Sequence, residues 1–158
     1  MDSINYTQEQ YSEDVDKCIN FLQNCYPYNH FDMIVSVAMG GVYLGEALNH
    51  YLHLPHYFIK AKSYVGQQRG ELSVAIPEGV HNCGTKLLLV DDIADSGHTL
   101  DAILKKLPSK QVQIITLFYK PRSIVKPDYY AREIANDSWI NFFWEKETTK
   151  ESMNVQSL

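Results

Sequence analysis

One segment constrains the fold more than any other: four apolar residues, Leu87 to Val90, run directly into two aspartates, Asp91 and Asp92. An uninterrupted apolar run of this length predicts a strand that is buried on both faces and lies in the centre of a parallel sheet. The residues that follow, 95–99, read Asp-Ser-Gly-His-Thr and predict a tight turn that opens a helix over 99–107. Strand, turn and helix in this order form one α/β unit.

The rest of the chain repeats this alternation. Apolar, β-rich runs at 33–38, 55–60 and 112–118 predict three further strands, and helical spacing over 42–51 predicts a helix after the first of them. Near the N-terminus, Thr7 and Gln10 form a capping-box pattern ahead of an apolar stripe that extends to Cys25. The expected fold class is therefore α/β, with a largely parallel, twisted sheet flanked by helices.

A length of 158 residues with 45% hydrophobic content favours one domain, 1–158. We expect a core at about 30–120, a small aromatic hood at about 121–146 and a polar tail at 147–158. The aromatic density at 126–145 fits either a site element or an apolar patch that closes the sheet edge or contacts a second copy. The polar, glycine-bearing stretch 62–70 fits either a mobile loop over a site or an idle surface loop.

Composition excludes several classes of protein. Fourteen basic residues against nineteen acidic ones give a net charge of −5, which argues against a nucleic-acid-binding surface. No apolar run approaches the roughly 18 residues of a membrane span, and no secretory leader is recognisable, so we expect a cytoplasmic protein. Three cysteines without CxxC spacing argue against a disulfide framework or a zinc site, and we expect all three to be small buried apolar residues.

The acidic pair and the turn after it suggest a specific chemistry. Parallel sheets bind their ligands at the carboxyl ends of the strands, where Asp91 and Asp92 are expected. Backbone N–H groups of the turn, with the hydroxyls of Ser96 and Thr99, would converge beside a helix N-terminus, which suits a phosphate monoester. Carboxylates next to a phosphate site suit the hydroxyls of a sugar and a hard cation, so Mg²⁺ is the expected ion.

The segment from Leu87 to Leu100 closely resembles the phosphoribosyl-diphosphate-binding motif of type I phosphoribosyltransferases, which has four apolar residues, two acidic residues, two apolar residues and then Asp-Thr/Ser-Gly-x-Thr. The resemblance extends from about Met33 to Glu145 and is strongest to the small xanthine-guanine and hypoxanthine enzymes. It implies that Asp91 and Asp92 contact the ribose hydroxyls, that Asp92 binds magnesium and that Asp95 assists deprotonation of the purine. The implied phosphoribosyl diphosphate site comprises Met39, Gly40, Gly41, Asp91, Asp92, Ala94, Asp95, Ser96, Gly97, His98 and Thr99.

Two loops resemble further parts of these enzymes. Met39-Gly40-Gly41 resembles the pyrophosphate loop, although Met39 stands where Arg or Lys is frequent. A diglycine allows the backbone to approach an anion closely. Ser63-Tyr64, with Arg69, resembles the catalytic loop that closes over the diphosphate, so the resemblance implies catalytic roles for Ser63, Tyr64 and Arg69 beside Asp95.

The base site is implied by the C-terminal part of the chain. Lys120 follows the expected strand at 112–118, and in the resembling enzymes a lysine at this place donates to O6 of the purine. Trp139 would stack on the base, and the backbone carbonyl of Ile140 would accept from a 2-amino group. Glu145 occupies the position of an acidic residue near a second magnesium.

The implied function is Mg²⁺-dependent transfer of a phosphoribosyl group from phosphoribosyl diphosphate to a 6-oxopurine, by a homo-oligomer. Three alternatives stay open at this point, and one of them keeps the same chemistry. The acceptor could be adenine or a pyrimidine, or the chain could be a regulator that senses phosphoribosyl diphosphate. A phosphotransfer receiver domain also places acidic residues, a Ser/Thr and a Lys on strand ends, but it needs its acidic pair after the first strand.

Overall fold

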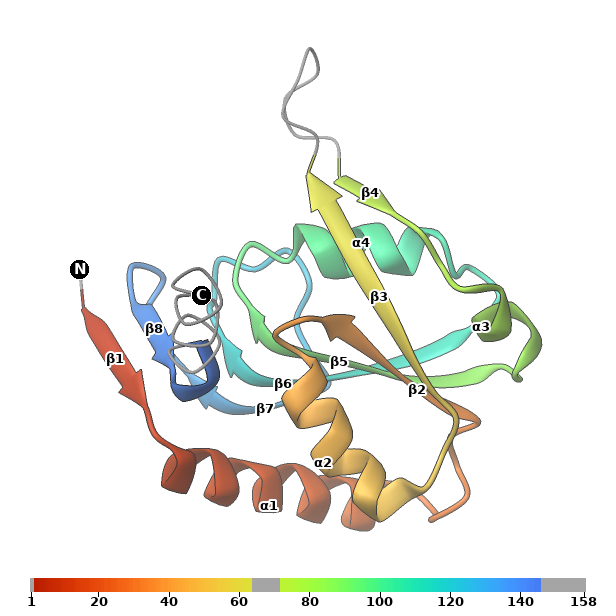
Figure 1. Ribbon diagram of the computed structural model, residues 1–158, viewed down its shortest axis with the longest axis horizontal. Helices are drawn as coiled ribbons and strands as arrows, with labels where there is room; N and C mark the ends of the chain where they lie inside the picture. Colours follow the sequence, from red (N-terminus) through yellow and green to blue (C-terminus); the bar gives the residue numbers. More distant parts are fainter. Residues whose placement is uncertain (1, 64–71, 146–158) are drawn as a thin grey trace, which may run out of the picture.

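The computed structural model describes residues 2–63 and 72–145. A six-stranded sheet runs through its centre in the order β4-β3-β2-β5-β6-β7, and every neighbouring pair is parallel except β3 and β4 (Figure 1). The strands are β2 (Met33–Ala38), β3 (His56–Ser63), β4 (Leu72–Val74), β5 (Lys86–Ala94), β6 (Gln111–Tyr119) and β7 (Tyr129–Glu133). The largely parallel α/β sheet that the sequence predicts is therefore confirmed.

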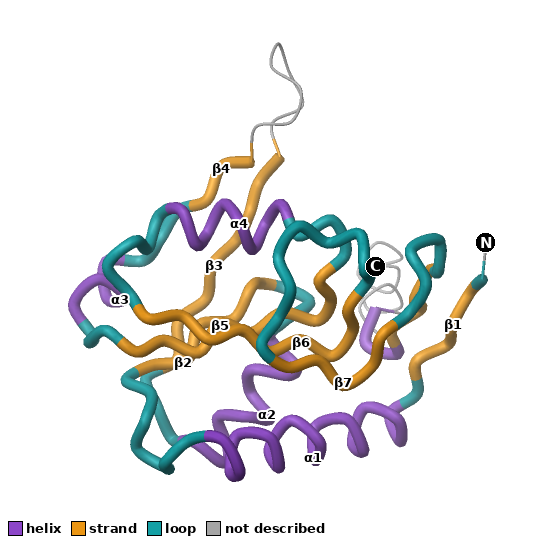
Figure 2. The backbone as a smooth tube through the Cα atoms, turned by 180° about the vertical axis from the view of Figure 1, so that it is seen from behind, coloured by secondary structure: helices purple, strands orange, loops and turns teal. Residues whose placement is uncertain are grey.

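Helices cover both faces of this sheet. The helices α1 (Gln8–Cys25) and α2 (Val42–Leu52) lie on one face, and α3 (Glu78–Asn82) and α4 (His98–Lys105) lie on the other (Figures 1 and 2). In β5, Leu88 and Val90 belong to the core on the side of α1 and α2, whereas Leu87 and Leu89 belong to the core on the side of α4. The apolar run of β5 is buried on both faces because the strand lies between two helical layers.

A second, two-stranded parallel sheet joins the two ends of the described chain. β1 (Ser3–Tyr6) pairs with β8 (Trp139–Phe142), so Ile4 lies opposite Ile140. The Tyr6 hydroxyl donates to the fully buried Asp14 on α1 at 2.7 Å. Arg132 on β7 donates to the same carboxylate oxygen at 2.7 Å. A buried charge is stable only with such partners, so this network fixes β1 and α1 against the edge of the main sheet.

Several sequence predictions differ from the structure in detail. The strand expected at 87–90 continues to Ala94, because the backbone of Asp91 stays paired with Thr116 of β6. The helix expected at 99–107 spans His98–Lys105, and β1, β4 and α3 are too short to have produced a pattern. The expectation that all three cysteines are buried is confirmed for Cys18 only, since Cys25 is exposed at the end of α1 and Cys83 is partly buried. Within the described ranges, the helices lack the length and apolar character needed to cross a bilayer.

Candidate active site

The acidic pair lies where the sequence predicts, at the carboxyl end of β5. Asp91 is buried, with 9% of its surface exposed, and its Oδ1 accepts the backbone N–H of Asp92 at 2.8 Å. Asp92 in turn accepts the N–H of Ile93 at 2.8 Å. These bonds orient both carboxylates at one edge of the sheet without neutralising either of them.

Both aspartates resist ionisation. Desolvation and the neighbouring charge of Asp92 raise the pKa of Asp91 well above its usual value. Desolvation also raises the pKa of Asp92. Among the residues that the structure describes, no basic side chain forms an ion pair with either carboxylate. A bound cation would therefore favour the ionised form of both carboxylates.

The loop after β2 packs directly against this pair. A Cβ atom on Gly40 would collide with the carboxylate of Asp92. A Cβ atom on Gly41 would lie 2.6 Å from the Val90 carbonyl oxygen of β5 and 2.8 Å from that of Val37. Met39, after a cis peptide bond with Ala38, is 65% exposed. Glycine is required at position 41, where the loop backbone approaches the backbones of β2 and β5, while a side chain at position 40 would displace the Asp92 carboxylate.

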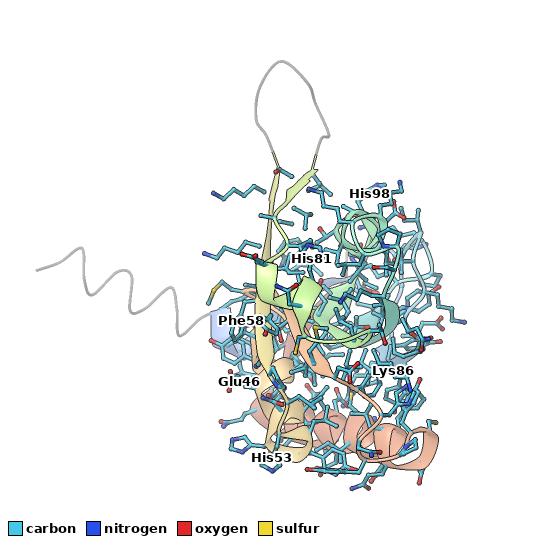
Figure 3. The ribbon with its side chains drawn as sticks, turned by 90° about the vertical axis from the view of Figure 1, so that its right-hand side faces the viewer. Glu46, His53, Phe58, His81, Lys86 and His98 are labelled. Carbon is cyan, nitrogen blue, oxygen red and sulfur yellow. The ribbon has the colours of Figure 1, made fainter. Side chains whose placement is uncertain are left out.

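The turn after β5 has the form expected of a phosphate site. Gly97 adopts φ 82° as the residue before α4, a conformation that side chains rarely tolerate. The His98 N–H donates to Ser96 Oγ at 3.3 Å, and Ala94, the last residue of β5, is fully buried beneath the turn. Ser96, His98 and Thr99 line a pocket of about 570 Å³, together with Leu72, Asp101, Ala102 and Lys105. His98 is the first residue of α4, and Figure 3 labels it beside this helix.

Asp95 is held differently from the pair before it. Lys120 Nζ lies 3.3 Å from Asp95 Oδ1, and Arg122 Nε donates to the same oxygen at 2.8 Å. The Nη2 of Arg122 also contacts this oxygen. Lys120 is almost fully buried, whereas the side chains of Asp95 and Arg122 are about half exposed. Asp95, directly after β5, therefore balances the charge of the buried Lys120, which directly follows β6.

A pocket of about 290 Å³ opens beside this cluster. It is lined by Asp95, Lys120, Arg122, Asn136, Asp137, Ser138 and Trp139. Trp139 is 60% exposed at the start of β8, so its ring is available to stack on a planar ligand. Ile140 has its side chain in the core and its backbone in the pairing with β1. The structure thus brings Asp95, Lys120 and Trp139 together around one pocket, with Ile140 just outside it.

Glu145, the last described residue, approaches the acidic pair from the hood side. Desolvation and the charge of Asp92 raise the pKa of Glu145. The oxygen donors of Asp91 and Asp92 fit Mg²⁺, which usually binds one or two carboxylates and completes its shell with water and substrate phosphates. Within the described part of the chain, no three His, Cys, Asp or Glu side chains gather as a set that could hold a metal ion.

Part of the expected catalytic loop lies outside the described residues. Tyr64 and Arg69 belong to this part, and Ser63 is the last residue of β3. The described residues at this edge of the sheet therefore include those predicted for phosphoribosyl diphosphate and for the base, but not the whole predicted catalytic loop.

Sequence reasoning missed four residues that line the 290 Å³ pocket: Arg122, Asn136, Asp137 and Ser138. Arg122 follows Lys120 by two positions, and its N–H donates to Asn136 Oδ1 at 2.9 Å. A second basic residue so close to the predicted base-binding lysine is the one signal that could have identified it. Asn136 lies in a polar turn and has no such signal.

A second chain of polar side chains lies away from this edge. Ser36 Oγ is 2.7 Å from His56 Nε2, and His56 Nδ1 is 3.5 Å from Glu46 Oε1. These residues lie on the side of α2 and β3 where Figure 3 labels Glu46 and Phe58. The order resembles a hydrolytic triad, but Ser36 is fully buried. The expected role is structural, because a substrate cannot reach the serine.

Comparison with known proteins agrees with this geometry. The model of the phosphoribosyl transferase domain family matches residues 7–149. The xanthine-guanine phosphoribosyltransferase of Chromohalobacter salexigens is 33% identical over 116 residues, which cover 73% of this chain and 69% of that protein.

Solved structures give the same picture. A purine phosphoribosyltransferase from Pyrococcus horikoshii has a TM-score of 0.75 at 30% identity, covering 91% of this chain and 94% of that one. The xanthine-guanine-hypoxanthine phosphoribosyltransferase of Helicobacter pylori has a TM-score of 0.79 at 27% identity, covering 99% of both chains. With the motif on β5 and the turn before α4 in place, the chain belongs to the phosphoribosyl transferase domain family.

Proposed function

We propose that the protein is a purine salvage enzyme that transfers the 5-phosphoribosyl group of phosphoribosyl diphosphate to guanine, xanthine or hypoxanthine and releases pyrophosphate. The observation that carries the proposal is the pocket in which Lys120, Asp95 and Trp139 meet, next to the turn before α4. The relatives named for xanthine and guanine support the same acceptor class.

The phosphoribosyl diphosphate would lie along the edge formed by β2, β5 and α4. The turn from Ala94 to Thr99 would bind the 5′-phosphate through backbone N–H groups and two hydroxyls. Asp91 and Asp92 would accept from the ribose hydroxyls. Gly40 and Gly41, after Met39, would let the loop backbone reach the diphosphate, since Gly40 already approaches the Asp92 carboxylate closely.

We propose Mg²⁺ as the cofactor, held by Asp92, with Glu145 near a second ion. When bound, Mg²⁺ neutralises charge on the diphosphate leaving group. The fit rests on the donor set: two adjacent carboxylates at the end of β5, which form no ion pair with a described basic side chain.

The base would enter the 290 Å³ pocket and stack on Trp139. Lys120 donates to O6, while the Ile140 carbonyl would serve a 2-amino group. As a purine ring nitrogen forms the bond to the anomeric carbon, the bond to the diphosphate oxygen breaks and its electron pair leaves with the diphosphate. Asp95 accepts the proton that the base gives up. Positioning and electrostatic stabilisation dominate such a reaction.

We extend the proposal to Ser63, Tyr64 and Arg69 as residues that act on the diphosphate. From the sequence, we also propose that the protein is a single domain, forms a homo-oligomer and is located in the cytoplasm.

The test compares kcat/KM for guanine, hypoxanthine, xanthine and adenine in the wild type and in Lys120→Ala. An ammonium group can only donate, so it suits a 6-oxo group and opposes a 6-amino group. We expect the wild type to reject adenine by up to about 10⁴-fold and Lys120→Ala to lose most of that preference. Equal use of adenine and guanine by the wild type would overturn the assignment to 6-oxopurines.

A further inference from the structure

We propose that Arg122 is a positioning residue for the reaction: it holds one oxygen of Asp95 so that the other faces the base. The inference rests on the proposed function. It starts from an asymmetry in how the Asp95 carboxylate is bound.

The hydrogen bonds and ion pairs that described residues make with the Asp95 carboxylate all involve one oxygen, Oδ1. Arg122 Nε donates to Oδ1 at 2.8 Å, Arg122 Nη2 contacts Oδ1, and Lys120 Nζ lies 3.3 Å from Oδ1. No described residue donates a hydrogen bond to Oδ2. Because Asp95 lines the 290 Å³ pocket, this second oxygen remains as an acceptor for a ligand there.

Arg122 can fix the carboxylate because its own position is fixed. The backbone N–H of Arg122 donates to Asn136 Oδ1 at 2.9 Å. The backbone N–H of Ser123 donates to the Lys120 carbonyl at 2.9 Å. The Ile124 N–H donates to the Ser96 carbonyl at 2.9 Å. The segment 120–124 is thus tied to the turn that carries Asp95, so the two side chains keep their relative place.

A guanidinium group suits this task better than an ammonium group. Arginine presents its donors in a planar fork, whereas lysine is a point charge on a flexible stem. With Lys120 alone, the carboxylate could rotate about its side-chain bond and exchange its oxygens. Two donors from one rigid fork on Oδ1 hinder that rotation. The lysine therefore remains available to O6 of the base, while the arginine orients the carboxylate.

The first experiment measures steady-state kinetics of Arg122→Ala and Arg122→Lys with guanine and phosphoribosyl diphosphate. A misplaced catalytic group costs on the order of 10²-fold in rate. We expect kcat of Arg122→Ala to fall on that scale with an unchanged KM for phosphoribosyl diphosphate, and Arg122→Lys to recover only part of the loss. Added guanidinium ion, below denaturing concentrations, should partly restore Arg122→Ala. An unchanged kcat would overturn the proposal, as would equal losses in kcat and in phosphoribosyl diphosphate affinity.

The matched control is Lys126→Ala. Lys126 is an exposed cation on the same connecting segment, with its Nζ 5.8 Å from the ring centre of Tyr119 and no contact with Asp95. It should keep wild-type kinetics and show no response to guanidinium ion. A loss equal to that of Arg122→Ala would mean that general positive charge matters, and not the contact.

A second experiment needs no turnover, so it separates this inference from the proposed function. It compares the unfolding midpoints in urea of Arg122→Ala, Asp95→Asn and the double variant. Residues in contact give non-additive effects. We expect the double variant to lose less than the sum of the single losses. Additive losses would overturn the contact even if the wild type uses guanine. Non-additive losses in a protein that uses no 6-oxopurine would sink the proposed function and leave the contact standing.

Discussion

Two acidic groups stand only a few residues apart at the same edge of the sheet, and the protein treats them in opposite ways. Asp91 and Asp92 are desolvated and have raised pKa values, with no basic partner among the described residues. Asp95, in the turn that follows, is half exposed and contacts both Lys120 and Arg122.

This difference fits the two roles proposed above for the pair and for Asp95. A pair of like charges without a partner is costly until a cation binds, so it suits a metal and the diphosphate substrate. A half-exposed carboxylate that two basic side chains hold in place suits contact with a base in the adjoining pocket. The contrast predicts that substitutions in the pair and at Asp95 affect the activity of the protein, its stability and the pH dependence of that stability differently.

The largest effect should come from Asp95→Asn. An asparagine cannot accept the proton of the base, so turnover should fall by roughly 10²–10⁴, the usual contribution of a positioned general base. Single-turnover kinetics with guanine would measure it. Wild-type turnover in this variant would remove Asp95 from the mechanism and erase the contrast with the pair.

Stability should respond with opposite signs. Asp92→Asn removes one of two like charges and keeps an acceptor for the Ile93 N–H, so the metal-free protein should gain about 1 kcal/mol, the scale of a stabilising substitution at a functional site. Asp95→Asn removes the partner of two cations and should lose about 1 kcal/mol, the upper range for a partly exposed ion pair. Urea unfolding without Mg²⁺ measures both, and equal signs would break the comparison.

A smaller effect should appear in the pH dependence of stability. The unfolded chain ionises its aspartates near pH 4, while the folded protein resists because the pKa values of Asp91 and Asp92 are raised. The unfolded state therefore loses protons first, and this contribution to stability falls as pH rises from about 4 through the raised pKa values. Thermal unfolding of the metal-free protein at several pH values should show a shallower fall in Asp92→Asn. Identical slopes would mean that the pair does not carry the effect.

Sequence reasoning predicted the elements that are apolar runs. The strands β2, β5 and β6 lie within a few residues of their expected places, because burial in a central sheet forces a continuous apolar pattern. The helices α1, α2 and α4 were recognisable from helical spacing, a capping box and a turn. β1 could not be predicted in this way. Its four residues pair with β8 at the far end of the chain, and no local pattern reports such a contact.

The site shows the same limit. Asp91 and Asp92 and the turn after them were recognisable because a contiguous motif carries them. Arg122 was not recognisable, because its role depends on how the loop after β6 folds back onto the turn before α4. The contact is so close that a Cβ atom on Gly97 would collide with the Ser123 hydroxyl. Pairings between loops that are distant in sequence arise from packing and leave little trace in composition.

The most direct measurement of the central claim is calorimetric titration of phosphoribosyl diphosphate, with Mg²⁺ present, into the wild type, Asp92→Asn and Asp95→Asn. If the pair binds the diphosphate substrate and Asp95 serves the base, Asp95→Asn should bind it like the wild type and Asp92→Asn should bind it far more weakly. A loss of binding in Asp95→Asn equal to that in Asp92→Asn would contradict the division of the two tasks.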